Sequence, residues 1–193
     1  MANIDAGKLT AEDEASPIPN DLIQQGKAEV ADAGGKAQAD NILSQAGMPA
    51  TGKRVSITMP DGEARAFTFT PDDGSNGPWP GVIFFMDAPA IRPAMFQMSQ
   101  RLADHGYFVL LPDVFWRAGP YEPINMAEAF KDEATRRETF AKLMGSTNAE
   151  KQMADTGVWI DWLLARPEVS SAKVGMTGYC MGAGISLRAA GTF

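Results

Sequence analysis

From about residue 54 onward, short apolar runs alternate with segments of helical periodicity. Residues 54–59 ("RVSITM") and 63–71 ("EARAFTFTP") alternate apolar and polar positions on either side of Asp61-Gly62, which predicts an antiparallel hairpin with a tight turn. The runs 81–86 ("GVIFFM") and 107–113 ("YFVLLPD") show no such alternation. They are typical of strands that are buried on both faces of a sheet.

Between and after these runs the apolar spacing becomes helical. A first helix is predicted between Pro93 and Gly106, and a second covers 149–167 ("AEKQMADTGVWIDWLLARP"). Residues 172–178 ("AKVGMTG") predict a third buried strand, and a further helix begins near 181. This order of elements predicts an α/β domain with a mostly parallel sheet and helices on both faces.

The pattern is not uniform along the 193 residues. Residues 1–50 contain no aromatic side chain and few large apolar ones, so we expect a mobile N-terminal extension that cannot offset its own ordering entropy. Residues 51–193 form the predicted domain. Within it, 114–149 make a long excursion after a strand, and excursions of this kind often cover a binding site like a lid.

Composition narrows the class of protein. A formal charge of −7 with scattered basic residues opposes binding to nucleic acid, and no apolar run is long enough to span a membrane. One cysteine and one histidine exclude a disulfide framework and leave too few ligands for a structural zinc site. We therefore expect a cytoplasmic protein without metal or other cofactor.

The single cysteine lies in "TGYCMG", residues 177–182, between the predicted third strand and the last helix. A dinucleotide-binding G-x-G-x-x-G pattern fails here, because Gly182 and Gly184 would need a third glycine at Leu187. No phosphate-binding G-x-x-x-x-G-K-[ST] sequence occurs either. The remaining interpretations are a nucleophile elbow, G-x-C-x-G, or a small buried hydrophobic residue.

An elbow has specific physical requirements. The nucleophile sits on a sharp, strained strand-to-helix turn, and the positions two before and two after it leave room only for hydrogen. Gly178 and Gly182 meet this requirement around Cys180. The N-terminus of the next helix favours a thiolate, and the amide of Met181 would point at the oxyanion of an attacked carbonyl group.

At this point the chain resembles a known family, the dienelactone hydrolases, which are α/β-hydrolase-fold enzymes acting on esters and lactones with a Cys-His-Asp triad. The resemblance covers about residues 54–193. It is carried by "GYCMGAGISLRAA", "YFVLLPDVFWR", "GVIFFMDAPAIRP" and "DWLLARPEVSSAKVGMTGYC". It implies a hydrolase of carboxylic ester or lactone bonds in small molecules.

The resemblance also implies roles for individual residues. Cys180 matches the nucleophile, and Asp87 occupies the place where many members have a Glu that contacts the resting thiol. The amide of Ala88 would be the second oxyanion donor beside Met181. An arginine that grips a substrate carboxylate would correspond to one of the following two residues, Arg136 or Arg137.

In this fold the triad acid and histidine follow the nucleophile, yet no residue after Cys180 is Asp, Glu or His. His105 ends the first helix, far upstream, where we do not expect the base. We therefore expect a fold that stops after the elbow helix, as in an incomplete chain of an ordinary hydrolase. Its last strand would be an apolar edge open to self-association. The alternative is a non-catalytic homologue that acts as a thiol sensor or binds a partner.

Overall fold

The computed structural model of the chain describes residues 47–121, 132–170 and 172–193. The predicted N-terminal extension therefore lies outside the described residues, apart from its last four positions. Among these, Met48 is half-buried and packs against the hydrophobic core of the domain. A side chain from the segment that precedes the first strand thus packs against the core.

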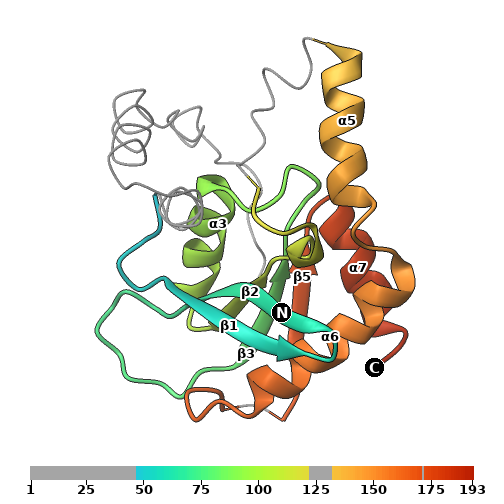
Figure 1. The fold of residues 1–193 in the computed structure, drawn as a ribbon. Helices are drawn as coiled ribbons and strands as arrows, with labels where there is room; N and C mark the ends of the chain where they lie inside the picture. The colour runs from blue at the N-terminus through green and yellow to red at the C-terminus, as the bar shows by residue number, and fades with distance from the viewer. Residues whose placement is uncertain (1–46, 122–131, 171) are drawn as a thin grey trace, which may run out of the picture.

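In the described part of the chain, a five-stranded sheet forms the centre of the domain (Figure 1). Its strands are β1 (Lys53–Met59), β2 (Gly62–Phe69), β3 (Gly81–Phe85), β4 (Phe108–Pro112) and β5 (Gly175–Gly178). The spatial order is β1-β2-β4-β3-β5. The hairpin β1-β2 and the pair β2-β4 are antiparallel, whereas β3 runs parallel to both β4 and β5.

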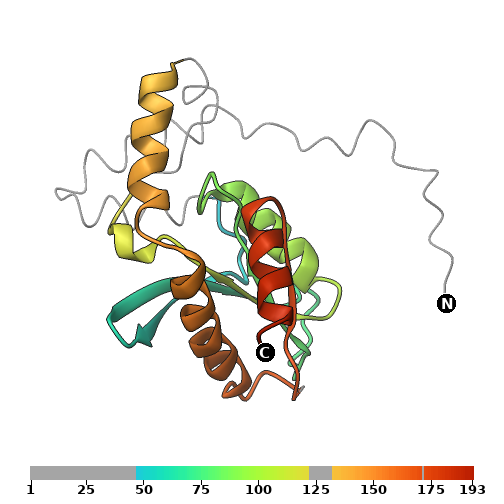
Figure 2. The ribbon, with the colours of Figure 1, turned by 90° about the vertical axis from the view of Figure 1, so that its right-hand side faces the viewer.

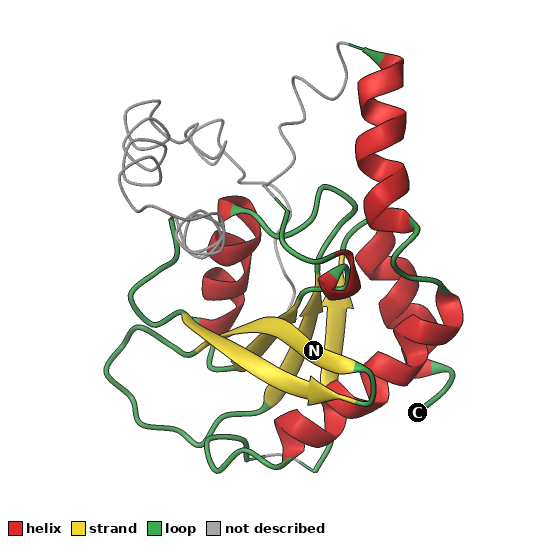
Figure 3. Ribbon diagram, viewed as in Figure 1, coloured by secondary structure: helices red, strands yellow, loops and turns green. Residues whose placement is uncertain are grey.

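Helices cover both faces of the sheet, as the sequence predicts (Figure 3). The helices are α3 (Pro93–Ala103), α5 (Glu133–Met144), α6 (Ala149–Leu164) and α7 (Met181–Ala190), with a short 3-10 turn η2 (Trp116–Ala118). On one face Phe96 of α3 packs on Phe67, with ring centroids 4.8 Å apart. On the other face, covered by α6 and α7, Trp159 packs on Phe85 at 6.2 Å. None of the described helices is long and apolar enough to cross a membrane.

Local sequence explains most element boundaries. Every residue of β3 and β4 is buried, in agreement with their unbroken apolar runs. Pro93 stands at the start of α3, and Gly106 takes a positive φ of 90° just after its end. The side chain of Asn148 caps α6 by accepting a hydrogen bond from the amide of Lys151 at 2.9 Å.

The prediction of a third buried strand at 172–178 is wrong in extent and in burial. Only Gly175–Gly178 is a strand, and its residues are exposed or half-buried. It pairs with β3 on one side, and no described strand pairs with the other. The apolar run at 172–178 indicated burial. A strand is buried only when neighbouring elements cover it, and the local sequence does not determine those neighbours.

Arg117, in the excursion after β4, bonds to two other parts of the domain. Arg117 donates to both carboxylate oxygens of Asp155, at 2.7 and 2.8 Å, and to those of Asp61, at 2.7 and 2.9 Å. Trp116 adds an indole hydrogen bond to Asp155 and lies under the guanidinium of Arg117. The hydrogen bonds from Arg117 hold the pKa of Asp61 below its usual range. The β1-β2 turn, the excursion and α6 are thereby joined.

The two sheet edges differ in charge, which predicts how the chain associates. The edge strand β1 carries Lys53 and Arg54, whereas β5 carries no charged residue. Uncharged edges pair readily with other strands. We expect the chain to self-associate with rising concentration in sedimentation experiments, and Thr177→Lys to shift it toward monomer. The matched change Thr58→Lys on β1 should leave association unchanged; a purely monomeric parent chain would contradict this.

The carboxylates bound to Arg117 should differ in their effect on stability. Asp155→Asn removes a charge that is 2% exposed and paired, so we expect unfolding in urea to require about 2 kcal/mol less free energy. Asp61→Asn should cost far less, because its carboxylate is 55% exposed and screened by solvent. Equal losses in the two variants would show that Asp155 has no special part in joining α6 to the excursion.

Candidate active site

Cys180 lies at a strained turn between β5 and α7. Its backbone has φ 53° and ψ −118°, an uncommon conformation for a residue with a side chain, and its side chain is exposed. The strand ends at Gly178 and the helix begins at Met181. The sharp strand-to-helix turn has the geometry expected of a nucleophile elbow, and within the described residues Cys180 is exposed rather than buried in the core.

The two elbow glycines are required by the close approach of β3 to the turn. A Cβ placed on Gly182 would overlap the carbonyl oxygen of Phe85 and lie 2.8 Å from that of Met86. A Cβ on Gly178 would lie 2.7 Å from the same oxygen of Phe85 and 2.8 Å from the carbonyl carbon of Gly182. These neighbours are backbone atoms that cannot move aside independently. Only glycine therefore fits both positions.

The predicted oxyanion donors lie beside the turn. Met181 is the first residue of α7, and the first N–H groups of a helix have no partner within it. Ala88 follows β3, whose last residues touch the start of α7, and in the described residues its amide makes no hydrogen bond. Both amides thus come from segments that meet next to Cys180.

Asp87 is held by an arginine that the sequence analysis did not single out. Its two carboxylate oxygens accept hydrogen bonds from Arg92 at 2.5 and 2.8 Å, and both side chains are largely buried. Arg92 also donates to the carbonyl of Ala90, a residue with a positive φ of 72°. The predicted contact of Asp87 with the thiol stays a prediction, while its ion pair with Arg92 fixes the loop that follows β3.

A second buried ion pair lies where β4 ends. Arg65 of β2 donates to Asp113 at 2.7 and 3.2 Å, and the hydroxyl of Tyr121 donates to the same carboxylate at 2.6 Å. Burial, reinforced by the charge of Asp113, raises the pKa of Tyr121 well above its usual range, so the phenol stays protonated. Burial opposes the charge of Arg65, but Asp113 raises the pKa of that guanidinium overall. Arg65, Asp113 and Tyr121 therefore satisfy one another's charges and hydrogen bonds, which indicates a structural role.

The arginines predicted to bind substrate lie on α5, which stands out beyond the sheet in two perpendicular views (Figures 1 and 2). Arg137 is 79% exposed and pairs with Glu133 one helical turn earlier, as the spacing predicts. The amide of Arg136 bonds to the carbonyl of Asp132. Binding of a substrate carboxylate by either arginine stays a prediction.

His105 lies at the end of the sheet opposite to Cys180. It follows α3 just before β4 begins, whereas Cys180 comes after the end of the parallel strand β5. Its Nδ1 is 2.7 Å from the carbonyl oxygen of Arg101, and the residue is exposed. Among the described residues the sulfur of Cys180 makes no hydrogen bond to any acid or histidine. The position of His105 agrees with the expectation that it is not the base.

The sequence analysis did not predict the arginines that pair with Asp87 and Asp113 at the C-terminal ends of β3 and β4. Asp87 and Asp113 each follow a parallel strand, where open α/β sheets gather polar groups, and that position could have marked them both for pairing. Arg92 lies only five residues from Asp87, whereas Arg65 could not be predicted as a partner because it lies 48 residues from Asp113. Within the described residues, no group of three or more His, Cys, Asp or Glu side chains could hold a metal ion.

Comparison with known proteins agrees with this geometry. The model of the dienelactone hydrolase family matches residues 64–193. The chain is 25% identical, over 132 residues, to carboxymethylenebutenolidases of Pseudomonas putida and Pseudomonas knackmussii, and the match covers 68% of this chain and 52% of each relative. A solved dienelactone hydrolase-like promiscuous phosphotriesterase from metagenomic libraries shares the fold, with a TM-score of 0.54 and 24% identity.

The matches cover only part of each known protein. The alignment spans 74% of this chain but 54% of the solved phosphotriesterase, and the chain spans about half the length of the curated relatives it matches. The family model, by contrast, covers more than half of the chain, from β2 through the elbow and α7 to its last residue. The elbow, the parallel strands and this match agree: the chain belongs to the dienelactone hydrolase family.

Proposed function

We propose that Cys180 is the nucleophile of a hydrolase that acts on small carboxylic esters or lactones. The observation that carries this proposal is the strained, exposed position of Cys180 at the N-terminus of α7, beside the end of β3. Membership of the dienelactone hydrolase family and the carboxymethylenebutenolidase relatives support the choice of substrate class. Neither a metal nor an organic cofactor takes part in the proposed reaction.

In the first step the thiolate of Cys180 attacks the carbonyl carbon of the substrate, and a C–S bond forms. The carbonyl oxygen becomes an oxyanion that accepts hydrogen bonds from the amides of Met181 and Ala88. The C–O bond to the leaving alkoxide then breaks, and the alkoxide takes up a proton from water. In a lactone the leaving group stays attached to the acyl group, so the ring opens.

In the second step water attacks the thioester, the C–S bond breaks, and the thiolate is regenerated with release of the acid. This step needs a base to remove a proton from the attacking water. The described residues place no acid or histidine in hydrogen-bond contact with Cys180, and His105 lies at the other end of the sheet. The proposed chemistry therefore separates into an acylation that the described residues support and a deacylation that needs a further group.

The same exposed thiol supports the alternative hypothesis, a non-catalytic thiol sensor. Accessible cysteines at helix N-termini are also prone to oxidation to a sulfenic acid. Modification of Cys180 by an oxidant would consequently agree with both hypotheses. Reaction of the thiol with an activated ester would agree with both hypotheses too. Acyl transfer that depends on the elbow geometry separates them, because only the hydrolase hypothesis requires the oxyanion donors around Cys180.

Acyl transfer should be visible with p-nitrophenyl acetate. We expect the 193-residue chain to release p-nitrophenolate in a single burst and to retain one acetyl group on Cys180, detected by peptide mass spectrometry. Cys180→Ala should abolish the burst. His105→Ala is the matched control and should leave the burst unchanged, because this histidine lies far from the elbow. Acetylation elsewhere, or a burst that persists in Cys180→Ala, would refute the proposal.

Two glycine variants test whether the elbow geometry itself is required. Gly182→Ala introduces a Cβ against two backbone carbonyls, so we expect it to destabilise the chain by about 2 kcal/mol and to abolish acetylation of Cys180. Gly184→Ala, two residues later in the same helix, has nothing within 4 Å of its Cβ and should retain the burst. If both variants are acetylated like the parent chain, the close crossing is not required for reactivity.

A further inference from the structure

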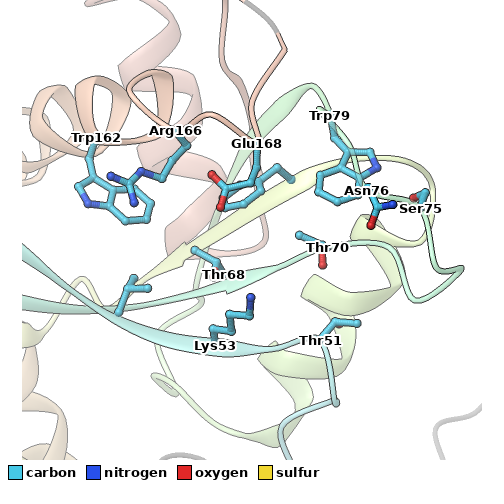
Figure 4. A pocket seen from close by; sticks show the side chains of 12 residues that line it. Thr51, Lys53, Thr68, Thr70, Ser75, Asn76, Trp79, Trp162, Arg166 and Glu168 are labelled. Carbon is cyan, nitrogen blue, oxygen red and sulfur yellow. The ribbon is translucent and has the colours of Figure 1, made fainter.

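A cavity of about 360 Å³ lies between the sheet and the C-terminal end of α6 (Figure 4). Its lining includes Trp79, just before β3, and Phe108, the first residue of β4. The cavity therefore lies where the parallel strands begin, whereas Cys180 lies where they end. This volume is within the range of small-molecule sites, and the proposed hydrolase reaction leaves it without a role.

The cavity has aromatic walls that are already in place. Trp162 of α6 and Trp79 are both half-buried and line it from different elements. The backbone of Trp79 is tied to the segment after α6, because its amide donates to the carbonyl of Glu168 at 2.8 Å and its carbonyl accepts from Ser170 at 2.9 Å. A planar apolar ligand would find these rings positioned before it binds.

Two cations line the same cavity. The guanidinium of Arg166 lies 4.6 Å from the ring centroid of Trp162, and its Nε is buried without a hydrogen-bond partner among the described residues. Lys53 extends from β1 toward the side on which Arg166 and Glu168 lie, as Figure 4 shows. In the described residues none of these three side chains forms an ion pair. With Glu168 as the one acidic lining residue, the cavity keeps a net positive charge.

Hydroxyl groups also line the cavity, among them those of Thr68 in β2, Thr70 just after β2 and Ser75 in the following loop. They can accept or donate hydrogen bonds to a polar substituent on a ligand. From the aromatic walls and the net positive charge, we propose that this cavity binds a small aromatic carboxylate. Its carboxylate group is held by Arg166 and Lys53, and its ring packs against the tryptophans.

Isothermal titration of the 193-residue chain with benzoate tests the proposal. We expect a dissociation constant on the order of 0.1–1 mM, as befits a ligand of this size, and weaker binding by about tenfold or more in Arg166→Gln and in Lys53→Gln. Arg101→Gln is the matched control, since Arg101 is exposed on α3 on the opposite face of the sheet. It should bind benzoate as the parent does.

Two further measurements make the result decisive. Benzyl alcohol, which has the ring without the carboxylate, should bind at least about tenfold more weakly than benzoate. Cys180→Ala should bind benzoate with unchanged affinity, so failure of the hydrolase proposal would not affect this one. No binding at ~10 mM benzoate, equal affinity for benzyl alcohol, unchanged affinity in either cation variant, or loss of binding in Cys180→Ala would each overturn it.

Discussion

The end of the sheet that carries Cys180 depends on one backbone crossing, where the start of α7 passes over the carboxyl end of β3. Added Cβ atoms at Gly178 and Gly182 would meet carbonyl groups of Phe85 and Met86 rather than flexible side chains. Because both positions are glycine, the turn between them is tight, and Cys180 takes a positive φ. The exposure of the thiol and the place of the Met181 amide both follow from this crossing.

The groups around Cys180 keep a fixed arrangement only if the loops after β3 and β4 are held in place. Asp87 and Asp113 follow the parallel strands β3 and β4, and each carboxylate is paired with an arginine, Arg92 or Arg65. Each ion pair satisfies charges that would be costly to leave alone in a buried setting. The Asp87–Arg92 pair holds the loop after β3, and the proposed role of the Ala88 amide as an oxyanion donor would require such a fixed position.

Local sequence predicted those features whose causes are local. The elbow was predictable because the spacing of two glycines around one cysteine reflects a steric requirement, and the buried strands β3 and β4 were predictable from unbroken apolar runs. The burial of 172–178 was not, because it depends on what lies on the far side of β5. Arg117 and Asp155 are 38 residues apart and come together only in the folded chain, so no local sequence pattern predicts this ion pair.

The two ends of the parallel strands are suited to different chemistry. Where the strands end, backbone amides at the start of α7 and after β3 are available, so this end can stabilise charge that develops on an oxygen during a reaction. Where the strands begin, the charges around the cavity are side-chain cations beside aromatic rings, which suit a ligand that is already charged. The buried strands β3 and β4 separate these ends. The same sheet can therefore carry a reacting centre and a separate binding site without either disturbing the other.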